Sequence, residues 1–303
     1  MTTPVAFIIF NRPDTTEKVF AEIRRARPSK LYIIADGPRT PEEKALTDAV
    51  RDAAGPVDWP CEVNKIFSNN NLGCRGRVIT GLNEVFEKEE KAIIVEDDCL
   101  PHPDFFEFCE VLLEKYQKDD RVGTINGTTI PGTGTNIEAS YYFSNFSVIW
   151  GWATWKRTWQ LVDNNMEVYS TLSNTEWLGK TFPDNPNAVE DINKFLNMTA
   201  SGYNAWSYVL LFATLYHQKI NIHPRQNLVS NIGFDSRGTH TIGKAPHANL
   251  PAFPLGTWNH PDELMVDQLS DLKIYKTFFE QNRRVPTFKE KLVHFIKRKI
   301  LKR

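Results

Sequence analysis

Four short apolar runs, separated by segments long enough to form a helix, constrain the fold of this chain most strongly. They cover residues 5–10, 31–35, 63–67 and 92–95, and the third is the weakest because polar residues interrupt it. A continuous apolar run is typical of a strand buried on both faces. Strands that alternate with helix-length segments predict a mostly parallel central sheet with helices on both faces. The sequence therefore predicts a Rossmann-like α/β fold.

The length and composition predict one large globular unit. The 303 residues lie near the upper size for one continuous core, and 41% hydrophobic with 24% charged residues is usual for such a domain. We expect a domain over residues 1–282, with a strand-and-helix half (1–125) and an aromatic-rich half (126–282), followed by a tail (283–303). The formal net charge of −1 gives no reason to expect a nucleic-acid partner.

The cysteines and the chain start indicate a cellular location. The four cysteines show no CxxC spacing, so neither a zinc site nor a redox motif is expected. So few cysteines in a chain of this length are typical of reduced thiols in the cytoplasm. The start lacks the pattern of a signal peptide, and no apolar run approaches the ~18 residues of a membrane helix. We therefore expect a cytoplasmic protein.

Polar residues directly follow three of the apolar runs. Asn11 and Arg12 follow the first run, Asp36 and Gly37 the second, and the acidic residues 96–98 the fourth. The carboxyl ends of parallel strands lie at one edge of a sheet, where such folds bind their ligands. We expect these residues to meet at one ligand site.

The adjacent carboxylates Glu96, Asp97 and Asp98 are the most informative local signal. At the end of an apolar strand they repel one another and lose solvation unless a cation is present. Mg²⁺ or Mn²⁺ would remove this cost, because such ions are typically held by one or two carboxylates together with substrate phosphates. The alternative is a solvated acidic turn that caps the next helix.

The acidic segment also carries a resemblance. From residue 95 the chain reads Val-Glu-Asp-Asp, followed from residue 103 by Pro-Asp-Phe-Phe. This resembles the DXD-type segment of GT-A glycosyltransferases, above all the N-acetylglucosaminyltransferase I family. Five further segments are similar to that family in the same order: PVAFIIFNR from residue 4, IADG from 34, LG from 72, GW from 151 and NIGFDSRGTHTIG from 231. The chain is also similar to bacterial sugar transferases that share an NLVSNIGF…THT segment. The resemblance implies a GT-A fold.

The resemblance implies a role for each matching residue. Asp36 would accept the imide N–H of a uracil ring, and Arg12 would bind the phosphate or base side of the nucleotide. Asp98 would be the metal ligand, with Glu96 and Asp97 contacting the ribose or the donor sugar. The implied cofactor is Mn²⁺ or Mg²⁺, which neutralises charge on a leaving diphosphate. The alternative for Asp36 is an ordinary turn residue before a glycine.

Two glycine-containing loops supply further candidates. Gly73 and Arg77 stand where a predicted helix opens, which suits a neighbouring phosphate. In the loop 231–243, Arg237 and His240 would meet the diphosphate or its metal. The expected donor site is completed by two residues from the strand ends, Asn11 and Gly37. For the loop 231–243, the alternative is an ordinary surface loop whose histidine has its hydrogen bonds satisfied within the protein.

The acceptor is expected on an aromatic surface in the second half of the chain. Trp150, Gly151 and Trp152 match the acceptor-side Gly-Trp of the family, and Trp206 follows further along. Sugars stack their C–H faces on indole rings, so these residues are candidates for acceptor binding. The alternative is that they are simply core, as most tryptophans are.

The catalytic base is the weakest part of the resemblance. The family carries a Trp-Asp-Asp segment that supplies the base, and here Trp206 is followed by Ser207 and Tyr208, neither of which is a base near neutral pH. Glu190 and Asp191, at the start of a predicted helix, are our first candidates. Two alternatives stay open: a retaining reaction without such a base, and a protein that binds the donor but transfers nothing.

The tail predicts a basic amphipathic helix. Phe288, Leu292, Ile296 and Ile300 recur at a spacing of four among seven lysines and arginines between residues 288 and 303. Such a helix is typical of attachment to anionic lipid, which would place the protein peripherally on the inner face of the cell membrane. The alternative is a solvated helix end packed on its own domain.

Together these features predict a metal-assisted glycosyltransferase, transferring a hexose or N-acetylhexosamine from a nucleotide-diphosphate donor to a glycan or polyprenyl-linked acceptor. UDP is the favoured nucleotide. A sugar-nucleotide pyrophosphorylase is disfavoured because no glycine-rich loop follows the first run, where the chain reads Phe-Asn-Arg-Pro. A non-catalytic nucleotide-sugar-binding protein of the same fold stays as the alternative, and the donor sugar, acceptor and linkage stay open.

Overall fold

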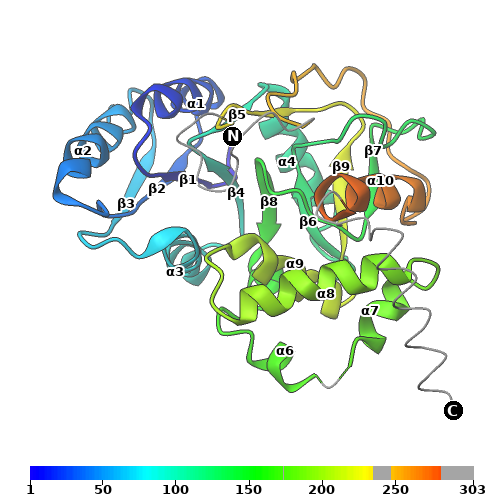
Figure 1. The fold of residues 1–303 in the computed structure, drawn as a ribbon. Helices are drawn as coiled ribbons and strands as arrows, with labels where there is room; N and C mark the ends of the chain where they lie inside the picture. Colours follow the sequence, from blue (N-terminus) through cyan, green and yellow to red (C-terminus); the bar gives the residue numbers. More distant parts are fainter. Residues whose placement is uncertain (173, 235–246, 281–303) are drawn as a thin grey trace, which may run out of the picture.

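The centre of the molecule is an eight-stranded sheet (Figure 1). The computed structural model describes residues 1–172, 174–234 and 247–280. The strand order is β3-β2-β1-β4-β8-β6-β9-β7. The strands are β1 (Val5–Ile9), β2 (Lys30–Ala35), β3 (Glu62–Phe67), β4 (Lys91–Glu96), β6 (Val122–Asn126), β7 (Tyr141–Ser144), β8 (Trp152–Trp155) and β9 (Ile220–Pro224).

The direction of pairing divides the sheet in two. β3, β2, β1 and β4 are parallel neighbours, as the four apolar runs predict. β8 runs antiparallel to both β4 and β6, β6 is parallel to β9, and β7 is antiparallel to β9. The predicted α/β fold with a mostly parallel central sheet is confirmed. β3 lies at the edge of the sheet, half exposed, which explains why polar residues interrupt the third run.

Helices cover both faces of the sheet (Figure 1). The long helices are α1 (Pro13–Ala26), α2 (Lys44–Ala53), α3 (Gly73–Lys88), α4 (Asp104–Lys115), α8 (Pro186–Ala200), α9 (Trp206–Tyr216) and α10 (Gln268–Phe278). The shorter ones are a 3-10 turn (Pro41–Glu43), α5 (Lys156–Trp159), α6 (Glu167–Thr171) and α7 (Glu176–Thr181). None of the helices within the described ranges is long and apolar enough to cross a membrane.

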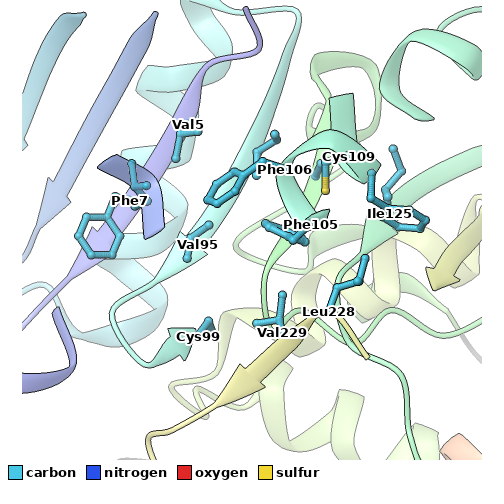
Figure 2. Close-up of a cluster of buried hydrophobic side chains, with 14 of the residues drawn as sticks. Val5, Phe7, Val95, Cys99, Phe105, Phe106, Cys109, Ile125, Leu228 and Val229 are labelled. Carbon is cyan, nitrogen blue, oxygen red and sulfur yellow. The ribbon is translucent and has the colours of Figure 1, made fainter. Parts of the chain in front are cut away.

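The two faces of the sheet pack into two separate cores, which explains the unbroken apolar run in β1. Val5, Phe7 and Ile9 point into a core shared with α1, α2 and α4, while Ala6 and Ile8 point into the other, shared with α3, α8 and α9. Successive side chains of a strand point to opposite faces, so each residue of a doubly covered strand must be apolar. Figure 2 shows part of the first core.

A small second sheet lies beside the end of β4. In it β5 (Cys99–Pro101) pairs antiparallel with β10 (Val229–Asn231), so that Cys99 lies opposite Asn231. Figure 2 shows Cys99 and Val229 on these two strands. This pairing holds the acidic segment 96–98 against residues far along the chain, because Ile232 donates its backbone N–H to the carbonyl of Asp98 at 2.8 Å.

Candidate functional site

A pocket of about 370 Å³ opens where β1, β2 and β4 end. The predicted donor and metal residues that line it are Asn11, Arg12, Asp36, Gly73, Arg77, Glu96, Asp97 and Asp98. The predicted acceptor residues Trp150 and Trp206 line it as well. The fold thus gathers segments from the first, second and fourth parallel strands at their carboxyl ends, the edge at which such sheets bind ligands.

The acidic turn does not form a cage of carboxylates. The Asp98 Oδ2 atom lies 3.0 Å from the Arg12 Nη1 atom, whereas the Asp97 Oδ2 atom accepts the backbone N–H of Phe10 at 2.9 Å. The side chains therefore diverge, and the described residues contain no group of three or more acidic, histidine or cysteine side chains placed to hold a metal.

Burial makes the charged forms of two acidic side chains in this pocket unfavourable. It raises the pKa of the Glu96 carboxyl well above its usual value, and the neighbouring charge of Asp98 adds to the effect. Burial, followed by the charge of Asp98, raises the pKa of Asp97 to about 7, although the Phe10 N–H and Arg12 oppose the rise. Further positive charge would therefore be stabilised in the pocket.

Asp36 is held by hydrogen bonds from the turn before α3. Its carboxylate accepts the backbone N–H groups of Gly37 (2.9 Å), Leu72 (2.9 Å) and Gly73 (3.0 Å), and the side-chain amide of Asn71 (3.1 Å). Burial raises its pKa, and these N–H donors oppose the rise. A carboxylate offers about four acceptor positions, so a uracil N–H would have to share or displace one of these donors.

Arg77 lies deeper in the same region, with 6% of its surface exposed. Its Nε and Nη2 atoms have no hydrogen-bond partner among the described residues, and Nη2 lies 3.7 Å from a Glu84 carboxylate oxygen. Gly81 makes room for it, since a Cβ there would stand 3.2 Å from Nη2 and 2.5 Å from Ile34. Arg77 therefore contributes positive charge beneath the pocket and packs between α3 and β2.

Gly37, a further predicted donor residue, is not among the residues that line the pocket. Gly37 packs against the backbone of Asn69, where a Cβ would come within 2.6 Å of the carbonyl oxygen. Arg237 and His240 lie outside the described residues. The last residues before that segment approach the site closely, because a Cβ on Gly233 would lie 2.1 Å from Asp98 Oδ2. The sequence does not reveal this contact, which joins residues 135 positions apart (233 − 98).

Some of the predicted acceptor residues belong to the core, and others line the pocket. Trp152 is 0% exposed and its ring stacks on Trp206 at a centroid distance of 5.6 Å, so Trp152 is core and does not face a ligand. Gly151 adopts a positive φ of 64° and does not line the pocket; a Cβ there would meet Val229 at 2.7 Å. Trp150 is half-buried, lines the pocket, and packs edge-on against Phe234 at 5.6 Å.

The candidate bases Glu190 and Asp191 are not among the residues that line the pocket. Asp191 is buried in α8 and accepts the hydroxyl of Tyr275 at 2.8 Å, and Glu190 pairs with Lys194 at 2.8 Å. The helix prediction alone gave no information on which way its acidic residues face. In the structure Asp191 links α8 to α10.

Asn204 and Arg75 are among the residues of the pocket region that have no match in the resemblance. Asn204 lines the pocket and its side-chain oxygen accepts the backbone N–H of Arg75 at 2.9 Å. The Arg75 side chain donates in turn to the carbonyl of Thr199 at 2.8 Å and to Asn164. Both contacts join the first half of the chain to the second, so no local sequence pattern predicts them.

No protein-family model matches the chain, and no curated protein matches its sequence. Among solved structures, it is similar to UDP-glucose pyrophosphorylase complexed with UDP-glucose, with a TM-score of 0.36, 10% identity, and coverage of 74% of this chain and 90% of that chain.

It is also similar to galactosyltransferase LgtC in complex with donor and acceptor sugar analogues, with a TM-score of 0.35, 10% identity, and coverage of 72% and 73%. A third similar structure is S. aureus TarS 1–349, with a TM-score of 0.34, 7% identity, and coverage of 56% and 49%. At these values the likenesses carry no inference about activity.

Proposed function

We propose that this chain is a glycosyltransferase that moves a sugar from a nucleotide-diphosphate donor to a glycan or polyprenyl-linked acceptor. The observation that carries the proposal is the pairing of Arg12 with Asp98 in a pocket at the strand ends. Such a pocket offers a cation for a diphosphate and an oxygen ligand for a metal ion. The GT-A resemblance of the sequence supports the same reading, with UDP the favoured nucleotide.

A hard divalent cation suits these residues. The side chains at the acidic turn offer carboxylate oxygens as metal ligands. The raised pKa values of Glu96 and Asp97 support added positive charge there. Asp98 would hold Mn²⁺ or Mg²⁺, with the remaining ligands coming from the donor diphosphate and water. The ion would supply charge neutralisation of the leaving diphosphate.

The protein's own residues would then bind and orient the two substrates. The acceptor hydroxyl oxygen forms the new bond to the anomeric carbon as the bond from that carbon to the diphosphate oxygen breaks. The nucleoside diphosphate leaves with the electron pair, and the hydroxyl proton passes to a base or to the departing phosphate oxygen. Arg12 would bind the diphosphate, while the Asp36 carboxylate accepts N–H groups of the turn at the start of α3.

A donor-hydrolysis screen of the full chain tests this proposal. UDP-, GDP-, TDP- and CMP-sugars are each incubated with Mn²⁺, and release of free sugar is measured. We expect turnover of one donor class, and its loss in the presence of a chelator. Binding of no sugar nucleotide, with or without Mn²⁺, would contradict the proposal.

A non-catalytic nucleotide-sugar-binding protein is the second candidate, because one observation favours it. Among the described residues, the carboxylates that line the pocket are Asp36 and residues 96–98, and all of these belong to the donor side. No described carboxylate there is left to serve as base for an inverting transfer. Tight binding of a donor without hydrolysis or transfer would support this candidate.

A further inference from the structure

One wall of the pocket is formed by residues 203–208, where the chain passes from α8 into α9. Tyr203 is 37% exposed and Tyr208 is half-buried, and their ring centroids lie 6.3 Å apart with an interplanar angle of 39°. Tyr208 stacks in turn on Phe195 at 5.1 Å. Tyr203 and Tyr208, which we call the tyrosine platform, thus present an aromatic surface from the protein interior to the pocket.

The backbone of the platform is firmly held. The Tyr203 N–H donates to the carbonyl of Met198 at 3.1 Å, and the Tyr203 carbonyl accepts from the Arg75 guanidinium at 3.4 Å. The same guanidinium donates to the carbonyl of Thr199 at 2.8 Å, and Asn204 accepts the Arg75 N–H. A surface fixed before binding loses less conformational entropy when a ligand arrives.

These contacts also fix the position of the platform relative to the donor side of the pocket. Arg75 lies in the first turn of α3, and the Asp36 carboxylate accepts the N–H groups of Leu72 and Gly73 just before it. The start of α3 is therefore bonded both to the end of β2 and to Asn204 of the pocket wall. A ligand on the platform would lie in the same pocket as one bound at the strand ends.

The chemistry of the wall suits an uncharged sugar. Residues 203–208 read Tyr-Asn-Ala-Trp-Ser-Tyr and carry no charged side chain. Aromatic faces supply apolar contact area while tyrosine hydroxyls, amides and serine supply hydrogen bonds, a combination typical of small-molecule sites. Burial raises the pKa of Tyr208 to about 12, so its hydroxyl keeps its proton at neutral pH. The C–H face of a pyranose ring matches such a surface.

We propose that Tyr203 and Tyr208 form the stacking platform for the pyranose ring of the acceptor. This inference rests on the proposed function, since it assigns the acceptor to one wall of the donor pocket. It replaces Trp152 of the sequence prediction, which is buried, with Tyr203, which the resemblance does not mark, and Tyr208, which stands in the segment where the family carries its base.

Saturation-transfer NMR on the full-length protein with UDP and Mg²⁺ tests it. The probes are the methyl β-pyranosides of glucose, galactose and N-acetylglucosamine. We expect transfer to the ring C–H protons of at least one probe. Tyr203→Leu should raise the dissociation constant of that probe about tenfold, equivalent to ~1.4 kcal/mol. Tyr203→Phe should retain binding because it keeps the ring.

The matched control is Tyr216→Leu, because Tyr216 stacks on Phe212 at 5.3 Å and does not line the pocket. Absence of transfer to all three probes, or unchanged binding in Tyr203→Leu, would overturn the inference. UDP affinity is measured in parallel on each variant. Unchanged UDP affinity in Tyr203→Leu shows that the pocket is intact, whereas wild-type protein without affinity for sugar nucleotides would contradict the proposed function instead.

Discussion

The guanidinium of Arg12 lies 3.0 Å from the carboxylate of Asp98, although the two residues are 86 positions apart in the chain. Arg12 follows β1 and Asp98 follows β4, and these strands are parallel neighbours in the sheet. Both side chains are largely buried, so their interaction is screened less than that of a surface pair. A metal ion bound to Asp98, as proposed above, would compete with Arg12 for that carboxylate.

The first prediction concerns this competition. Arg12→Gln removes the positive charge beside Asp98, so the affinity of the protein for Mn²⁺ alone should rise, by about tenfold for ~1.4 kcal/mol. The affinity for UDP should fall, because a cation for the diphosphate is lost. Both are measured by isothermal titration calorimetry. Asp98→Asn should weaken Mn²⁺ binding, and Asp48→Asn, at a half-buried carboxylate outside the pocket, is the control. Equal Mn²⁺ affinity in wild type and Arg12→Gln would contradict the prediction.

The second prediction concerns the close approach of Gly233 to the acidic turn. In Gly233→Ala the new Cβ would lie 2.1 Å from Asp98 Oδ2 and 2.7 Å from Arg12 Nη1, so one of these groups must move. We expect a loss of stability of about 1–3 kcal/mol, typical of overpacking, together with weaker UDP binding. Urea denaturation and calorimetry measure the two effects.

Gly179→Ala is the matched control for that substitution. Its added Cβ would stand in open space, and the residue lies inside α7, where alanine is favoured over glycine. Its stability should stay the same or rise slightly. If Gly233→Ala behaves like Gly179→Ala, the close contact has no energetic consequence.

The third prediction concerns the pH dependence of stability. Asp271 is buried and accepts hydrogen bonds from the Ser144 hydroxyl and from Asn145, and burial raises its pKa to about 6. Because the ordinary value is 3.8, the folded state binds the proton more tightly than the unfolded state. The contribution of this group to stability therefore falls as pH rises from about 4 through 6, by about 3 kcal/mol in total.

Asp271→Asn should remove that dependence, since an amide does not titrate and the Asn145 side chain can rotate to present its oxygen. Relative to wild type, the variant should gain stability between pH 5 and pH 8, and urea denaturation at several pH values measures this difference. Parallel pH curves for the two proteins would show that Asp271 does not titrate in this range.

The fourth prediction separates the two neighbouring tryptophans. Trp152→Ala should cost about 3–5 kcal/mol of unfolding free energy, because a fully buried indole leaves a cavity. Trp150→Ala should cost less stability, because this side chain is only half-buried, while it removes apolar surface from the pocket. Denaturant titration compares the two. A larger stability loss for Trp150→Ala than for Trp152→Ala would be incompatible with the observed packing.

The fifth prediction concerns the tail, which lies outside the described residues. If its basic residues attach the protein to anionic lipid, each contributes roughly 1 kcal/mol near the surface. Lys297→Glu with Lys299→Glu should then lower binding to anionic vesicles more than tenfold and leave binding to neutral vesicles unchanged. Vesicle sedimentation with the full chain measures this. The same two charge reversals at the exposed Lys44 and Lys118 serve as control, and equal loss in both double variants would exclude a specific role for the tail.

The sequence by itself determined the sheet that builds the site. The unbroken apolar runs of β1, β2 and β4 require burial on both faces, so parallel pairing under two layers of helices follows from the residues alone. The polar residues after these runs then had to meet at one edge. For this reason Arg12 and Asp98 could be placed in one pocket before the structure was known.

Only the tertiary structure decided how the side chains of that pocket are used. Asp36 is occupied by the turn before α3, Trp152 is core, and Asp191 is bonded to Tyr275. Periodicity tells whether a residue is on a helix or a strand, but α9 is apolar on nearly every face, so periodicity does not tell which of its faces meets the pocket. Contacts between distant segments, such as Arg75 with Asn204, decide this, because they exist only once the two halves have packed.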